Sequence, residues 1–135
     1  CPEILIGDFD CQYNELTDLK GGPKSVQGGY FCSTNELTTL EGCPEEIGYE
    51  FDCSVNNLTD LQYGPKRVES HFTADNNKLT SLKGCPEYIN GHFDLVDNDL
   101  RKYDYLYSEP QWITAEKLHK KMLIYINHFE RPRDE

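Results

Sequence analysis

Hydrophobic and polar positions recur along this chain with a period of 21 residues, from the N-terminus to about residue 106. Each unit repeats an aromatic, a small or cysteine, an asparagine, two leucine and a proline position in the same order. A 21-residue unit is too short to bury an apolar face by itself, so neighbouring units must stack around one continuous core. The pattern therefore predicts a solenoid. Its asparagine positions are Asn14, Asn35, Asn56, Asn77 and Asn98.

The third unit, FDCSVNNLTDLQYGPKRV, shows the order of elements within one repeat. Apolar and polar residues alternate from Phe51 to Cys53, which predicts a short strand with one face in the core. A turn follows at Asn56, and the Gly64-Pro65 pair predicts a second turn. A short amide at the first turn can bond backbone groups that the strand ladder does not reach, so we expect a structural role for the asparagines.

Phe51, Cys53, Asn56 and Leu58, with their equivalents in the other units, resemble the leucine-rich repeat over residues 1–106, in about five units of which the first is incomplete. The FDCSxNxLTxLxGxP form is similar to the short repeats of bacteria and bacteriophages. This resemblance implies an α/β fold: a right-handed solenoid with parallel strands on its concave face and a mostly irregular convex side. The family is a scaffold that binds many partners, so the fold does not name the function.

The repeat pattern ends before residues 107–135, which we expect to cap the last coil. Thr114 is a suitable N-cap for a helix over about 115–129, and apolar residues then follow at helical spacing. An alternative is that this helix binds a partner. The apolar positions of the helix are Leu118, Met122, Tyr125, Ile126 and Phe129.

Six cysteines fall into two periodic sets. Those at 11, 32 and 53 occupy a core column, where cysteine acts as a small apolar residue. Those at 1, 43 and 85 lie in alternate units, about 10 Å apart, which is beyond the reach of a disulfide. We therefore expect a reducing compartment, the cytoplasm, or the host cytoplasm if a phage encodes the chain.

With 24 acidic residues against 13 lysines and arginines, the chain has a formal charge of −11. This charge argues against direct binding to nucleic acid or to anionic lipid, because both need positive charge. Apolar runs approaching the roughly 20 residues of a membrane-spanning helix are absent from the sequence. The expected partner is a protein with a basic patch.

The acidic residues concentrate at the outward positions of the expected strands. Seven acids and no lysine or arginine stand there, and aromatic and aliphatic side chains interrupt them. Aromatic residues ringed by charge are typical of protein interfaces. The residues expected to bind the partner are Asp8, Asp10, Tyr13, Phe31, Tyr49, Glu50, Asp52, Val55, His71, Asp75, His92, Asp94 and Asp97.

These observations favour a binding protein, including a phage or bacterial factor that inhibits or regulates a host enzyme acting on nucleic acid. The alternative is a recognition fragment of a longer bacterial effector-type protein. We expect no enzyme activity, catalytic residue or cofactor, because the sequence shows no nucleophile with a base and no phosphate loop. His71 and His92 leave a zinc or nickel site as a minor alternative to no metal. The incomplete first unit also suggests self-association through an open N-terminal end.

Overall fold

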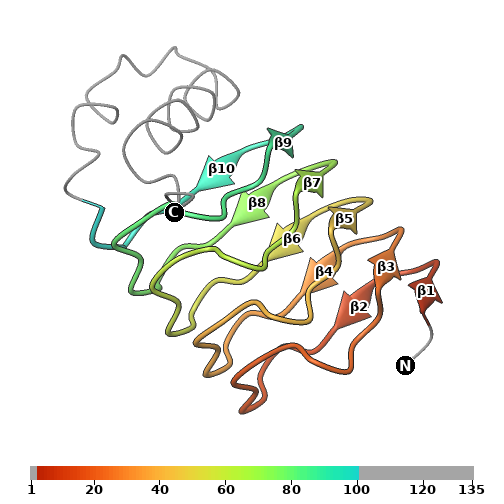
Figure 1. Cartoon of the computed structure of the whole chain (residues 1–135), viewed down its shortest axis with the longest axis horizontal. Coiled ribbons are helices and arrows are strands. Elements are labelled where there is room, and N and C mark those ends of the chain that lie inside the picture. Colours follow the sequence, from red (N-terminus) through yellow and green to blue (C-terminus); the bar gives the residue numbers. More distant parts are fainter. Residues whose placement is uncertain (1–2, 101–135) are drawn as a thin grey trace, which may run out of the picture.

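A computed structural model describes residues 3–100, which form a parallel β-solenoid of stacked coils (Figure 1). Each coil contributes two strands of two residues each. In chain order the strands are β1 (Ile4–Leu5), β2 (Phe9–Asp10), β3 (Ser25–Val26), β4 (Tyr30–Phe31), β5 (Glu46–Ile47), β6 (Phe51–Asp52), β7 (Arg67–Val68), β8 (Phe72–Thr73), β9 (Tyr88–Ile89) and β10 (Phe93–Asp94).

The strands form two parallel sheets, one of odd-numbered and one of even-numbered strands, each with five members in coil order. Within the even-strand sheet, Phe9 pairs with Tyr30 and Tyr30 with Phe51, so partners are 21 residues apart. The sequence period is therefore the sheet register. We number the coils 1 to 5 by their even strands, β2 to β10.

The core lies inside the stack and consists of columns of equivalent residues. The aromatic column runs from Phe9 through Tyr30, Phe51 and Phe72 to Phe93, with neighbouring ring centroids 4.9 to 5.7 Å apart. Burying this apolar area is what holds successive coils together. Leucines of the following columns are fully buried in the middle coils, among them Leu37, Leu40, Leu58, Leu79 and Leu82.

One fold expectation is corrected by the structure. Residues 3–100 contain no helix, so the α/β class is not supported, and the described part is a β-solenoid. The segments that join each even strand to the next odd strand, such as residues 11–24, contain no strand or helix. The aliphatic residues after each proline, such as Val26 and Ile47, pair in register and form the odd-strand sheet. The segment 107–135 and its expected helix at 115–129 lie outside the described residues.

The asparagine column has the structural role predicted for it. The side-chain amide of Asn56 donates to the carbonyls of Cys32, Cys53 and Ser54 at 3.0 to 3.1 Å, and its Oδ1 accepts the N–H of Leu37 at 3.0 Å. One buried side chain thus satisfies four backbone groups in two adjacent coils. The same four-bond pattern recurs at Asn35, Asn77 and Asn98.

The residue before each asparagine has a left-handed backbone, with φ between 53° and 59°. This conformation turns the chain out of the even strand and is unfavourable for β-branched residues such as Val55. It persists because the asparagine that follows bonds backbone groups of its own coil and of the preceding coil, and these bonds fix the turn. The side chains of this column therefore stand at the end of the strands. They belong to Tyr13, Thr34, Val55, Asn76 and Asp97.

Tyr30 occupies a position that is phenylalanine in every other described coil, and its buried hydroxyl has no hydrogen-bond partner among residues 3–100. We expect Tyr30→Phe to raise the free energy of unfolding by about 1 kcal/mol, because it removes an unsatisfied polar group and keeps the ring. Urea denaturation measures the change, with the exposed Tyr13→Phe as control. A loss of stability in Tyr30→Phe would contradict this prediction and indicate that the hydroxyl is hydrogen-bonded.

Candidate functional site

The outward side chains of the even-strand sheet line up in columns across the coils. Sheet pairing places Asp10 beside Phe31, Phe31 beside Asp52, Asp52 beside Thr73, and Thr73 beside Asp94. Acids therefore occupy this column in coils 1, 3 and 5, and uncharged side chains occupy it in coils 2 and 4. The structure confirms that these three predicted residues share one face.

Backbone hydrogen bonds hold the three carboxylates of this column. In each, Oδ1 accepts the N–H of the residue two positions later, at 3.0 Å for Asp10, 3.0 Å for Asp52 and 3.1 Å for Asp94. The Ser54 hydroxyl also donates to Asp52 at 2.6 Å. These bonds restrict side-chain rotation before any partner arrives, which lowers the entropy lost on binding.

A second outward column contains Asp8, Gly29, Glu50, His71 and His92, one residue from each coil. Two of its side chains bond the next coil: Asp8 Oδ1 accepts the Gly29 N–H at 2.7 Å, and His71 Nδ1 accepts the His92 N–H at 2.9 Å. The two imidazoles stack with centroids 4.8 Å apart. Predicted site residues in this column thus tie adjacent coils as well as facing outward.

Glycines make these bridges possible, a role that the sequence analysis missed. A Cβ at Gly28 would lie 2.3 Å from Asp8 Oδ1, and one at Gly91 would lie 2.5 Å from His71 Nδ1. The available signal is their spacing, since each stands 20 residues after the side chain for which it leaves room.

The predicted apolar anchors differ in exposure. Tyr13 is 78%, Tyr49 56% and Val55 46% exposed, as an interface residue requires. Phe31 is instead half-buried, because its ring covers Gly29, where an added Cβ would lie 2.6 Å from two ring carbons. The Phe31 ring thus forms a flat apolar strip between the acids of coils 1 and 3.

The charges of the even-strand face are not neutralised by lysine or arginine within residues 3–100. Asp75 and Asp97, at the ends of their strands, complete the set of seven predicted acids, and Asp75 accepts a bond from Asn76 at 3.0 Å. The described ion pairs all use other acids. These pairs are Lys20–Glu41, Lys24–Glu3, Lys66–Glu45 and Arg67–Glu69.

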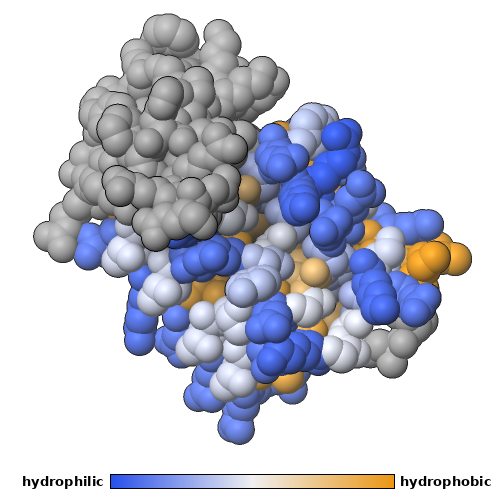
Figure 2. All heavy atoms as spheres, in the orientation of Figure 1, coloured by the Kyte–Doolittle hydropathy of each residue, from blue (hydrophilic) through white to orange (hydrophobic). Residues whose placement is uncertain are grey.

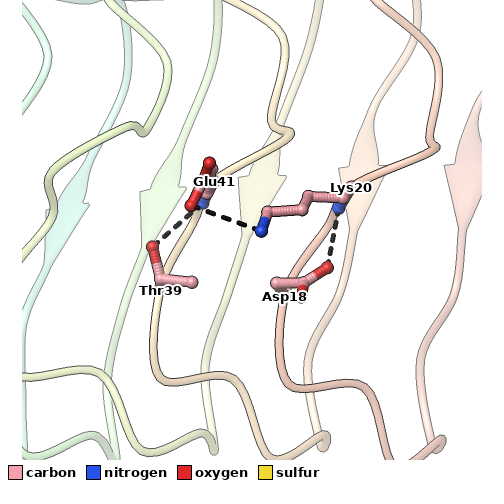
Figure 3. Close-up of polar contacts among 4 residues, drawn as sticks. All are labelled: Asp18, Lys20, Thr39 and Glu41. Atoms are coloured by element: carbon pink, nitrogen blue, oxygen red, sulfur yellow. Dashed lines mark hydrogen bonds and ion pairs between the residues drawn. The ribbon is translucent and has the colours of Figure 1, made fainter.

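Figure 3 shows how one of these pairs is built away from the even strands. Lys20 Nζ lies 3.8 Å from Glu41 Oε2, between the connecting segments of adjacent coils. Asp18 Oδ1 and Thr39 Oγ1 accept the backbone N–H groups of Lys20 and Glu41, at 2.9 and 3.1 Å. The cations of the four ion pairs are thus held against glutamates outside the acidic face.

The described thiols and imidazoles form no evident reactive centre. Burial raises the pKa of Cys11 to about 11 and that of Cys32 and Cys53 well above the usual range, so these thiols are neutral at physiological pH. Residues 3–100 hold no group of three or more His, Cys, Asp or Glu arranged for a metal ion. The stacked His71 and His92 contribute two imidazoles, and one nitrogen is already hydrogen-bonded.

Hydrophobic side chains gather at the end of the stack that carries β1 (Figure 2). Leu16 is 37% exposed there, whereas its equivalent Leu37 in coil 2 is fully buried. A depression of about 350 Å³ opens beside Leu16 and is lined by Phe9, Cys11 and Leu19. The exposed end of coil 1 is therefore apolar.

Comparison of the chain with protein-family models, curated proteins and solved structures finds no match. Within residues 3–100, the structure contains no helix with the length and apolar character needed to cross a membrane. Among the described residues, the feature that bears on function is the even-strand face itself, with its columns, its fixed carboxylates and its unneutralised charge.

Proposed function

We propose that this chain is a protein-binding solenoid of the leucine-rich-repeat type, whose even-strand face docks on a basic surface of a partner protein. One observation carries the proposal: seven acids lie on or beside this sheet, its outward positions hold no lysine or arginine, and four of the six described bases pair with glutamates elsewhere. Such segregation concentrates negative potential on one surface, which speeds encounter with a positive one.

The apolar side chains give this face a second component. Tyr13 and Val55 protrude at the strand ends, and the Phe31 ring lies flat between acidic coils. In protein interfaces, buried aromatic residues supply much of the affinity, and surrounding charges supply orientation and on-rate. A nucleic-acid-binding enzyme of a bacterial host, with its basic groove occluded, is the partner class that we propose.

Two other hypotheses stay predictions. Self-association through the apolar end of coil 1 is favoured by the exposure of Leu16, but the net charge of −11 opposes it at low salt. Recognition of a target as part of a longer effector-type protein would use the same even-strand face.

Reversing two charges should abolish docking. We expect the double variant Asp10→Lys, Asp52→Lys to weaken partner binding by at least about a hundredfold, because like charges placed opposite one another cost several kcal/mol. Affinity capture from the cytoplasm of the source cell, followed by mass spectrometry, compares the variant with the unmodified chain. We expect a basic protein to be captured by the unmodified chain and lost with the variant.

The double variant Glu46→Lys, Glu87→Lys is the matched control, because it makes the same charge change at exposed positions on the odd-strand side. It should retain the partner. Equal capture by both variants would place the interface outside the even-strand face and refute the proposal.

A further inference from the structure

Carboxylates in the two outward columns of the even strands alternate from coil to coil, and Asp75 of coil 4 lies beyond these columns at the end of its strand. Coils 1 and 3 each carry two outward acids, whereas coil 2 presents Gly29 and Phe31 and coil 4 presents His71 and Thr73. In coil 5, Asp94 restores an acid to the column. The Asp10 column is therefore a row of three fixed carboxylates, one in every second coil.

The spacing of this row selects among the regular conformations of a bound chain. Hydrogen-bonded strands of a sheet are about 4.8 Å apart, and the even strands of successive coils pair in register, so alternate coils are about 9.6 Å apart. In a polyproline II segment every third residue returns to the same face after about 9.3 Å. In an α-helix the corresponding seven-residue step is about 10.5 Å. Over the two steps from coil 1 to coil 5, the mismatch is about 0.6 Å for polyproline II and about 1.8 Å for the helix.

An extended β-strand does not match the spacing of the carboxylates, because its successive side chains point to opposite faces. In a strand, residues two apart share a face but are only about 6.8 Å apart, and residues three apart point to opposite faces. The regular structure that keeps cations on one face at the required spacing is therefore the three-residue repeat of polyproline II.

We propose, in an inference that rests on the proposed function, that the partner presents a polyproline II segment with a lysine or arginine at every third position. This segment crosses the even strands along the stacking direction and places its cations opposite Asp10, Asp52 and Asp94. The residues between the first two cations lie over the Phe31 ring, where proline rings pack well against an aromatic surface.

The charge requirement and the spacing requirement can be separated with two peptides of equal composition, three lysines and seven prolines. In PKPPKPPKPP the lysines share one face of the polyproline II helix, and in PPKPKPKPPP they point to three faces. Isothermal titration calorimetry at low salt, with the whole chain, measures both dissociation constants. We expect the first peptide to bind at least about tenfold more tightly, because it alone engages three carboxylates together.

The variant Asp52→Asn removes the central charge, and its amide oxygen can still accept the Ser54 N–H. It should weaken binding of the first peptide by about fivefold, the value of one partly exposed charge pair. Glu46→Gln, on the odd-strand sheet, should leave this dissociation constant unchanged.

The outcomes distinguish this inference from the proposed function. Equal affinity for the two peptides would overturn the spacing and leave charge-driven docking intact. The spacing would also be overturned, with charge-driven docking intact, if neither peptide binds but the double variant Asp10→Lys, Asp52→Lys still loses the captured partner. Absence of both peptide binding and a charge-sensitive partner would refute both proposals.

Discussion

Replacing Asn56 with alanine is expected to lower the free energy of unfolding by about 3–4 kcal/mol, a large part of the stability of a small domain. The change removes the four hydrogen bonds of a buried side chain: the Leu37 N–H loses its partner, and the carbonyls of Cys32, Cys53 and Ser54 each keep one other donor. Each lost hydrogen bond contributes about 0.5–1.5 kcal/mol, and the unsatisfied Leu37 N–H adds the cost of its own desolvation. Urea denaturation followed by circular dichroism measures the loss.

Asn14→Ala provides the matched control. Asn14 is exposed in coil 1, where its amide donates to the carbonyls of Cys11 and Gln12. Water can replace these bonds, so we expect a loss of about 1 kcal/mol. If Asn56→Ala were no more destabilising than Asn14→Ala, the asparagine column would not hold the coils together.

Gly42→Ala is the second substitution with a large expected effect, a loss of at least about 3 kcal/mol. Gly42 has φ of 103°, and a Cβ there would lie 2.2 Å from the carbonyl carbon of Leu19 and 2.4 Å from the Lys20 nitrogen. Because both contacts are backbone of the preceding coil, the stack itself must shift. Such overpacking adds to the strain of a left-handed residue.

Gly21→Ala separates the two contributions. Gly21 stands at the equivalent position of coil 1, with φ of 86°, and a Cβ there would meet no atom within 4 Å. Its substitution should therefore show backbone strain without the clash, about 1–2 kcal/mol. Equal losses in the two variants, measured by urea denaturation, would rule out the close approach of coils at Gly42.

The 21-residue period was sufficient to predict the solenoid, because equivalent residues of identical coils must meet in register. The odd-strand sheet was not predicted, because its strands have two residues and one aliphatic side chain each, too few to show an alternating pattern. The role of Asn56 could be inferred from its position after a strand. The left-handed backbone at Val55 could not be inferred, because valine itself disfavours that conformation.

For the candidate site, the alternation of inward and outward residues in a strand predicts which side chains share a face, but it does not predict how those side chains are held. The common face of Asp10 and Asp52 was expected from their sequence positions. The bonds that fix their carboxylates depend on local backbone geometry that composition does not encode. Phe31 was expected to be exposed, but an outward aromatic residue beside a glycine can lie flat on it, and here it does.

Docking of a basic partner on the even-strand face is what we propose for this chain. Its most direct test is to map backbone amide chemical shifts of the isotope-labelled chain by nuclear magnetic resonance, while the captured basic protein is added. We expect changes to concentrate on β2, β4 and β6, around Asp10, Phe31 and Asp52. Changes confined to the odd-strand sheet or to the connecting segments, with the even-strand amides unmoved, would contradict it.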